Sequence, residues 1–235
     1  MLSVQNLVAG YQNNVLIRNL TFSIQNPAFI AVIGHNGSGK TTFFKTLTRQ
    51  IPFSGEIFIN NQSVAPARNL FRSGTLSLLA QKNEVNFSVS VRELVVMGRF
   101  RFKRFFDNYN NIDYQCVEDV LEKIGITHLA SRDFLQLSGG EQQLVWLAQM
   151  MLQDAPLCLL DEPTQHLDIR YKRRVFDVMH RWVSDNDKTV LCITHDLSYL
   201  SDRDGFLLNF SKPDPTLEPL THENLEKNYD FLAKN

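Results

Sequence analysis

A glycine-rich loop between a buried strand and a helix constrains this chain more than any other segment. Residues Phe29–Ile33 form a short, continuous apolar run, typical of a strand buried on both faces of a parallel sheet. The glycines that follow can adopt backbone conformations that a side chain would block, so backbone N–H groups converge on phosphate oxygens where the next helix starts. The pattern Gly-x4-Gly-Lys-Thr therefore predicts a phosphate site formed by Gly34, His35, Asn36, Gly37, Ser38, Gly39, Lys40, Thr41 and Thr42.

A pair of carboxylates follows a second buried strand. Residues Leu157–Leu160 are apolar and lead directly into Asp161 and Glu162. Ligands collect at the carboxyl edge of a parallel sheet, so both carboxylates are expected beside the phosphate loop. We expect Lys40 on the β- and γ-phosphates, and Mg²⁺ held by the Thr41 hydroxyl and, through water, by Asp161. Glu162 is then the candidate general base that polarises an attacking water.

Three further side chains are candidates for the same site. His195 follows the apolar run Thr189–Ile193 and can contact the γ-phosphate and orient the water. Gln81 ends the run Leu76–Ala80, and its amide can bind Mg²⁺ or the water. Tyr11 offers a ring that can stack on adenine, an interaction worth ~1–3 kcal/mol by analogy with base stacking on aromatic side chains.

The order of strands and helices predicts an α/β fold with helices on both faces of the sheet. Helical spacing of apolar residues appears in the segment with Phe43 and Leu47 and in the segment with Val175 and Trp182. Alternation of apolar and polar residues over Leu20–Ile24 predicts a half-buried antiparallel strand, and Glu56–Asn60 predicts another.

The middle of the chain differs, because its pattern is mostly helical. We expect a helical subdomain at about residues 84–153, inserted into the α/β core of a single domain spanning 1–235. Ser90 and Glu93 predict a capping box, and Gly98 is expected to end that helix. Residues Lys212–Pro219 contain three prolines and are expected to be irregular, within a tail at 211–235 where Thr221 caps a last helix.

Leu137–Gln143 carries a second glycine-rich helix start. Ser138 and Glu141 have the spacing of a capping box, but Gly139 and Gly140 each cost a helix ~1 kcal/mol relative to alanine. Their presence suggests that something approaches this backbone closely. A helix N-terminus with bare amides binds anions, and the natural anion is the γ-phosphate held by another copy of the chain.

In this order, these motifs resemble the ATP-binding-cassette (ABC) ATPases over about Leu2–Asn209. The resemblance implies a P-loop NTPase (RecA-like) core with a small antiparallel β subdomain and the inserted helical subdomain. It also implies a head-to-tail homodimer in which Asp168 crosses the interface and Ser138, Gly139, Gly140 and Glu141 face the partner's ATP. Three positions depart from the commonest family pattern: the segment Gln165–Asp168, Glu141 and Leu144. None removes a group needed for hydrolysis.

The segments Asn86–Arg99 and Leu220–Leu225 are similar to importers of iron–siderophore, haem or cobalamin. This similarity implies an ATPase subunit that serves membrane permease subunits and, indirectly, an extracytoplasmic binding protein. The cluster Arg99–Phe106, with four aromatic and four basic residues, is then a candidate permease dock. Two alternatives stay open: a regulatory or nucleic-acid-associated ABC module, to which that cluster would also be suited, and the ATPase of an exporter.

Composition limits where such a chain works. The formal net charge of −1 gives no global positive field for nucleic acid, and no nucleic-acid partner is expected. Neither a signal pattern nor ~18 consecutive apolar residues are present, so we expect a chain that is soluble alone and held peripherally at the cytoplasmic face of the plasma (inner) membrane. The three widely spaced cysteines are expected to be buried, reduced thiols.

Overall fold

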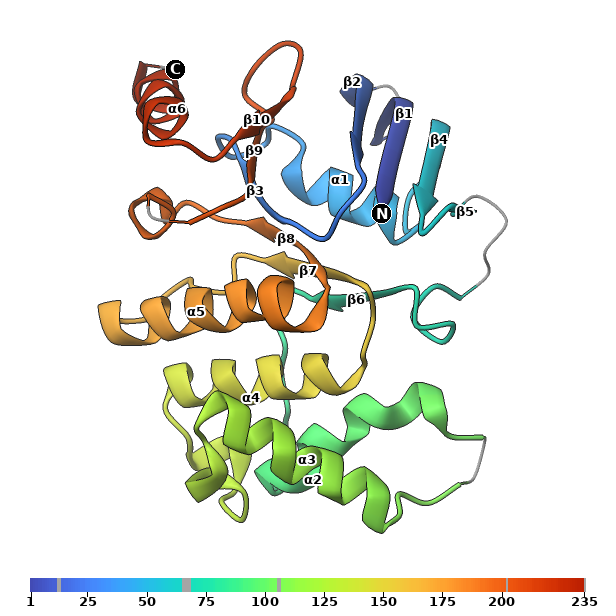
Figure 1. The fold of residues 1–235 in the computed structure, drawn as a ribbon, viewed down its shortest axis with the longest axis vertical. Helices are drawn as coiled ribbons and strands as arrows, with labels where there is room; N and C mark the ends of the chain where they lie inside the picture. The colour runs from blue at the N-terminus through green and yellow to red at the C-terminus, as the bar shows by residue number, and fades with distance from the viewer. Residues whose placement is uncertain (12–13, 65–68, 105–106, 202, 235) are drawn as a thin grey trace.

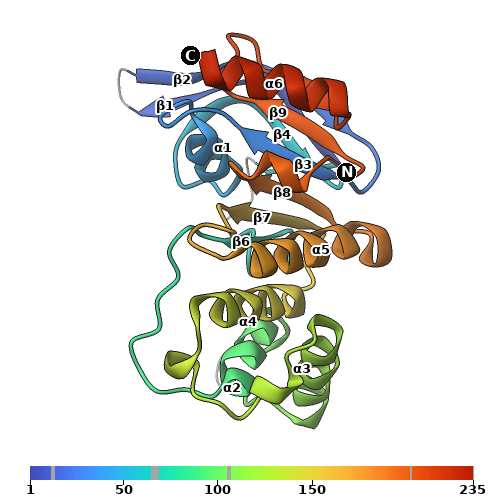
Figure 2. The same cartoon turned by 90° about the vertical axis from the view of Figure 1, so that its left-hand side faces the viewer.

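Two sheets and a group of helices are stacked along the long axis of the molecule (Figure 1). The computed structural model describes residues 1–11, 14–64, 69–104, 107–201 and 203–234. Helices α4 (Gly139–Leu152) and α5 (Ile169–Asn186) lie beside each other below the larger sheet in Figure 1, where α4 contacts β6 and α5 contacts β3 and β8 (Figures 1 and 2). The α/β core, the antiparallel sheet and the helical part are those predicted from the sequence.

The larger sheet has six strands in the order β10-β9-β3-β8-β7-β6, and every neighbouring pair is parallel except β9 and β10. Its strands are β3 (Phe29–Ile33), β6 (Leu76–Leu79), β7 (Leu157–Asp161), β8 (Thr189–Ile193), β9 (Phe206–Asn209) and β10 (Leu217–Pro219). The three apolar runs predicted as buried strands are β3, β7 and β8, and every residue in them is buried.

Alternate residues of β3 join two different cores. Phe29 and Ile33 pack with α4 and α5, whereas Ile30 and Val32 pack with α1 (Lys40–Leu47) and the antiparallel sheet. Successive side chains of a strand point to opposite faces, so a strand between two cores must be apolar throughout. This burial on both faces explains why β3 reads as a continuous apolar run.

The smaller sheet is antiparallel, with the order β2-β1-β4-β5. Leu20 and Phe22 of β2 are buried between exposed neighbours, as their alternation predicts. The turn after β4 has positive φ at Asn60 (49°) and Asn61 (62°), a geometry that asparagine tolerates and that suits a two-residue hairpin. The strands are β1 (Leu2–Tyr11), β2 (Asn14–Ile24), β4 (Phe53–Ile59) and β5 (Gln62–Ser63).

Between β6 and β7 the chain is helical. The elements are α2 (Val91–Val96), the 3-10 helix η1 (Met97–Phe102), α3 (Asn111–Ile124), the 3-10 turns η2 (Thr127–Leu129) and η3 (Phe134–Gln136), and α4. The predicted capping box at Ser90 and Glu93 is present at the start of α2. A second box at Asn110 and Asp113 starts α3.

Two predictions about where regular structure stops hold only in part. Helix α2 ends at Val96, just before Gly98 as predicted, but the helical path does not stop there, because the 3-10 helix η1 runs through Gly98. A Cβ at this position would lie 2.2 Å from the Gln149 carbonyl oxygen, so glycine serves close packing against α4. Residues Leu217–Pro219, expected to be irregular, form edge strand β10, where Pro219 pairs with Phe206 at the strand end, a position that tolerates proline.

The C-terminal helix α6 (His222–Lys234) begins as predicted, with the Thr221 hydroxyl accepting from the Asn224 N–H. Another short 3-10 turn, η4 (Leu197–Tyr199), follows β8. The cysteines are free thiols: Cys158 and Cys192 are buried and Cys116 is half-buried. Among the described residues, no helix combines the length and hydropathy that crossing a bilayer requires.

Candidate active site

The predicted phosphate loop links β3 to α1, and its glycines have the expected backbone. The φ angles are 145° at Gly34, 81° at Gly37 and 106° at Gly39, all in the region that favours glycine. The Lys40 ammonium donates to the carbonyl oxygens of Gly34 (2.6 Å) and His35 (3.0 Å), so its side chain folds back over the loop. The loop is therefore preformed around a buried cation.

The Lys40 and Asp161 side chains are both buried and lie close enough to interact electrostatically. Burial lowers the pKa of Lys40, and the nearby carboxylates of Glu162 and Asp161 partly oppose that change. Burial, reinforced by the Glu162 charge, raises the pKa of Asp161 to about 6, although Lys40 and the Thr41 hydroxyl counteract it. The positive charge near Asp161 is therefore too small to offset the effect of burial on the pKa of this carboxylate.

The Asp161 environment fits a magnesium ion. Mg²⁺ prefers hard oxygen ligands, and the Thr41 hydroxyl lies near enough to the Asp161 carboxylate to lower its pKa. The Gln81 amide, the third predicted ligand, lies one strand away at the end of β6. These three side chains supply oxygen atoms, and a cation bound to them would stabilise the buried negative charge of Asp161.

Glu162 lies where several segments meet. Its backbone has a positive φ of 52°, and its N–H donates to the Ile193 carbonyl of β8 at 3.0 Å. One carboxylate oxygen accepts from the Gln81 amide at 3.0 Å, and the other lies 3.3 Å from His195 Nε2. Three residues proposed from separate strand ends are therefore in contact.

Gln165 belongs to this cluster and was not predicted as a site residue. Its side-chain oxygen accepts from the Gln81 amide nitrogen at 3.2 Å, so Gln81 donates to Glu162 and Gln165 together. The sequence reveals Gln165 only as a departure from the commonest family pattern. Nothing in the spacing of residues 81 and 165 indicates that they meet.

The turn that carries His195 is held by its neighbour, Asp196, another residue missed from the sequence. Asp196 accepts from the Thr164 hydroxyl and from the Lys172 ammonium, both at 2.6 Å. Its backbone N–H donates to the Thr194 hydroxyl at 3.0 Å. The end of β8 is thereby fixed to the segment between β7 and α5.

Tyr11 ends β1, and its residue surface is 43% exposed. The Lys45 ammonium of α1 lies 5.6 Å from the centre of its ring. The ring is thus accessible on the side of the molecule that carries the phosphate loop, and its contact with adenine stays a prediction.

Ser138 starts α4 with the predicted capping box: Glu141 N–H donates to the Ser138 hydroxyl, and the Glu141 carboxylate accepts from the Ser138 N–H at 2.8 Å. The two glycines differ. A Cβ on Gly140 would lie 2.4 Å from the Tyr171 ring, whereas a Cβ on Gly139 would meet nothing within 4 Å. Packing inside the chain therefore explains Gly140 but leaves Gly139 unexplained.

Asp168 has a structural role that the sequence analysis did not assign. Its carboxylate accepts from the Tyr171 N–H at 2.9 Å and so caps α5. Tyr171 then packs against Gly140 at the start of α4. The two segments expected to face a second copy are thus connected within one chain.

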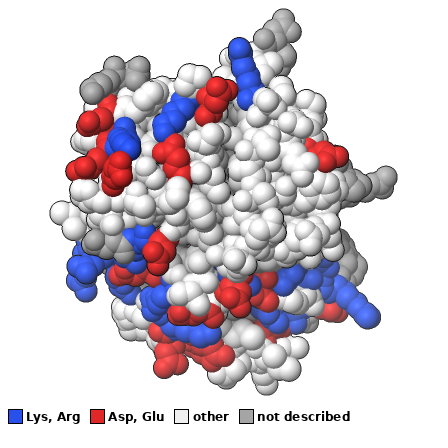
Figure 3. All heavy atoms as spheres, turned by 45° about the horizontal axis from the view of Figure 1, so that its top comes forward, with Lys and Arg blue, Asp and Glu red and all other residues white. Residues whose placement is uncertain are grey.

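Charges of both signs are mixed over the face in Figure 3, which has no broad basic area. Within the basic-aromatic cluster Arg99–Phe106, two arginines pack on one aromatic ring. The guanidinium groups of Arg99 and Arg101 lie 3.9 and 4.2 Å from the centre of the Phe102 ring. Phe105 and Phe106, which belong to the same predicted cluster, lie outside the described residues.

Residues 17–165 match the protein family described as ABC transporter. The probable ABC transporter ATP-binding protein from the ycf23-apcF intergenic region of Cyanophora paradoxa is 35% identical over 199 residues, covering 83% of this chain and 79% of that protein. The iron(3+)-hydroxamate import ATP-binding protein FhuC of Bacillus subtilis (strain 168) is 30% identical over 212 residues, 90% of this chain and 79% of FhuC. An inward-facing transporter of metal-chelate type superposes with a TM-score of 0.83 at 29% identity, covering 97% of this chain and 88% of that chain.

Proposed function

The chain belongs to the ABC transporter family of ATPases, and from this premise we propose that it is the ATP-hydrolysing subunit of an importer for a metal chelate of the iron–siderophore, haem or cobalamin type. The observation that carries the proposal is the contact of Glu162 with both Gln81 and His195 at the edge of the sheet that bears the phosphate loop. The direction of transport and the class of cargo are supported by the iron-chelate import named for FhuC.

ATP binds with its triphosphate in the loop Gly34–Thr42 and its adenine on Tyr11. Lys40, already held over the loop, pairs with the β- and γ-phosphates, and its burial strengthens that attraction. Residues Thr41, Gln81 and Asp161 would hold Mg²⁺, which would neutralise phosphate charge.

Hydrolysis proceeds with Glu162 as general base. The oxygen of a water attacks the γ-phosphorus, the water proton moves to the Glu162 carboxylate, and the bond to the bridging oxygen of the β-phosphate breaks. His195 and Gln81 orient the water and the carboxylate. Because each already contacts a different oxygen of Glu162, the two residues restrict rotation of that carboxylate.

Two copies of the chain form a head-to-tail homodimer around ATP. The start of α4 at Ser138 and Gly139 faces the partner's γ-phosphate, and the open space at Gly139 supports a close approach there. Gly140 and Glu141 line the same helix start, although each also has a partner within its own chain. Asp168 extends from the start of α5 towards the other subunit.

Residues 1–235 act as one nucleotide-binding domain, with a helical subdomain at about 84–153 and a tail at 211–235. Integral permease subunits bind this domain at the cytoplasmic face of the plasma membrane, and the cluster Arg99–Phe106 forms the surface that they contact. An extracytoplasmic binding protein delivers the chelate to the permease. The exposed Phe102 ring between two arginines supports a contact that is both apolar and charged.

Replacing Glu162 by glutamine tests the base. Glu162→Gln keeps the size of the side chain and removes the proton acceptor, so we expect steady-state ATP hydrolysis to fall by at least about 100-fold. Nucleotide binding should persist, and ATP should trap a dimer measurable by light scattering. Glu84→Gln, on an exposed carboxylate three residues after Gln81, is the matched control. Near-normal hydrolysis by Glu162→Gln would contradict the assignment of the base.

A further inference from the structure

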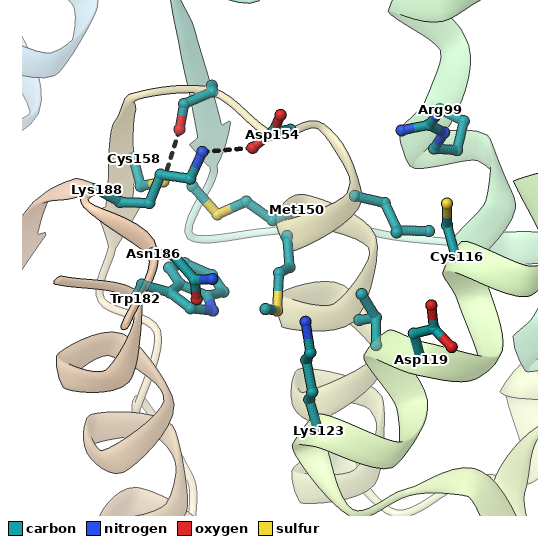
Figure 4. A pocket seen from close by; sticks show the side chains of 14 residues that line it. Arg99, Cys116, Asp119, Lys123, Met150, Asp154, Cys158, Trp182, Asn186 and Lys188 are labelled. Carbon is teal, nitrogen blue, oxygen red and sulfur yellow. Dashed lines mark hydrogen bonds and ion pairs between the residues drawn. The ribbon is translucent and has the colours of Figure 1, made fainter. Parts of the chain in front are cut away.

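A cavity of about 230 Å³ lies between α3, α4 and α5 (Figure 4). It lies near the amino end of β7, whereas Glu162 follows the carboxyl end of that strand. Ala155, just before β7, and Lys188, just before β8, are among the residues that line the cavity. Its apolar wall consists of Val120, Met150, Met151, Leu152, Ala155 and Cys158. A neighbouring cavity of about 300 Å³ shares Lys123, Met151, Trp182 and Asn186 with it, so the two form one hollow around Trp182 and Lys123.

The indole of Trp182 brings an unused hydrogen-bond donor to this hollow. The residue is 3% exposed, and its Nε1 has no hydrogen-bond partner among the described residues. Buried indole N–H groups are usually paired, because a buried donor without an acceptor is costly. An acceptor from outside the chain would satisfy it.

Lys123 brings an unpaired positive charge to the same place. The other two cations of the first cavity have partners: Arg99 pairs with Asp113, and Lys188 with Asp154. No ion pair forms at Lys123 within the part of the chain that the structure describes. In Figure 4 its ammonium extends from α3 towards the space beside Trp182.

We propose that this hollow is a binding site for a small amphipathic carboxylate. The carboxylate pairs with the Lys123 ammonium and accepts from Trp182 Nε1–H, and the apolar body lies against Met150 and Leu152. The hollow is separate from the proposed ATP site, and its chemistry does not depend on the proposed transport function.

Such a ligand would connect two parts of the fold. Lys123 belongs to the helical part, whereas Trp182 lies on α5 beside the sheet. Met150 and Leu152 lie at the end of α4 remote from Ser138. Binding at this junction therefore brings an external group into contact with the helix whose other end is proposed to face the partner's ATP.

Tryptophan fluorescence tests the site directly, because Trp146 and Trp182 are the two tryptophans of the chain. In a Trp146→Phe variant, all tryptophan emission comes from Trp182. We expect 4-bromobenzoate, whose heavy atom quenches indole emission, to quench it saturably. Lys123→Met in the same background should weaken binding by at least about 10-fold, since it removes a charge-assisted hydrogen bond. The control Lys227→Met removes an exposed lysine on α6 and should leave the affinity unchanged.

Two further measurements keep the test independent of the Trp146 substitution. In the unsubstituted chain, titration with 4-bromobenzoate should shift one of the two indole N–H signals in an NMR spectrum, and that signal should be missing from Trp182→Phe. Neutral 4-bromobenzyl alcohol should bind more weakly than the carboxylate. Quenching that rises linearly without saturation, or equal affinity in Lys123→Met, would overturn the proposal.

Discussion

At the scale of single residues, the Gln81 amide connects the proposed base to the segment before α5. Its nitrogen donates to both Glu162 and Gln165, which uses both hydrogens of the amide. The amide oxygen is therefore directed away from these two partners and is free for a cation or a water. Gln165 in this way determines how Gln81 is oriented, although it need not touch the nucleotide itself.

A double-mutant cycle of Gln81 and Gln165 measures this connection. We expect Gln165→Ala to lower kcat several-fold and Gln81→Ala to lower it more. The double variant should be no worse than Gln81→Ala, because the effect of Gln165 passes through Gln81. ATPase rates of the four proteins give the coupling. Gln115→Ala, on the exposed surface of α3, should change nothing, and simple additivity of the two effects would argue against the positioning role.

Asp161 predicts a specific pH dependence of stability without nucleotide. Its folded-state pKa of about 6 lies above the ordinary value of 3.8, so the folded chain binds the proton more tightly than the unfolded chain does. Its contribution is therefore favourable at low pH and is lost as the pH rises through 6. Between pH 4.5 and 7.5 the loss is about 2 kcal/mol relative to Asp161→Asn.

Urea denaturation of both proteins in EDTA measures that difference. The titration of groups that do not interact with Asp161 contributes equally to the pH dependence of the two proteins and cancels on subtraction. We expect the unfolding free energy of the original chain to fall relative to Asp161→Asn as the pH rises. A difference that stays constant across this range would mean that Asp161 titrates with an ordinary pKa in the folded chain.

The residues that the sequence revealed are those whose role depends on a local pattern. Lys40 follows a glycine-rich loop, and Asp161 ends an apolar run, so each is visible within about ten neighbouring positions. Gln165 and Asp196 act through contacts with residues distant in the chain, as does Ser211, whose hydroxyl accepts from the His35 N–H at 2.9 Å. No local periodicity encodes such pairings, and the positive φ of Glu162 has no sequence signal either.

At the scale of secondary-structure elements, the buried strands were predictable because their whole length must be apolar. The capping boxes at Ser90 and Ser138 were predictable because two side chains at fixed spacing satisfy the first amides of a helix. Strand β10 was not predictable, because its three residues include a proline and form a strand only by pairing with β9. Gly98 follows the end of α2, but it also permits the close packing of η1 against α4, which no local pattern reveals.

Alanine substitutions distinguish a glycine that is needed for close packing, Gly98, from one that borders open space, Gly139. Gly98→Ala would put a Cβ 2.2 Å from the Gln149 carbonyl oxygen, so η1 and α4 must separate and stability should fall by about 1–3 kcal/mol. Gly139→Ala meets nothing within 4 Å, so stability should be unchanged or slightly higher. Thermal and urea unfolding of both variants measure the difference. Equal changes in stability at the two positions would show that the close contact between Gly98 and Gln149 does not determine the cost of the substitution.

At the scale of the whole molecule, the helix start at Ser138 and the phosphate loop at Lys40 belong to different layers. Ser138 lies in the helical part and Lys40 in the α/β core. The internal contact of Gly140 with Tyr171 and the cap from Asp168 to α5 fix the start of α4 without filling the space at Gly139. A surface that is fixed and yet left open suits a partner that arrives from outside.

Gly139→Val tests this idea in the dimer. A Cβ at this position meets nothing within 4 Å in its own chain, so the added side chain would lie between the first amides of α4 and the partner's γ-phosphate. Introduced into Glu162→Gln, it should abolish the ATP-dependent dimer in light scattering. The affinity for a fluorescent ATP analogue should change by less than about 3-fold, because the phosphate loop of the same chain is intact. A dimer that forms equally well with valine at this position would exclude close approach of the partner's ATP to the start of α4.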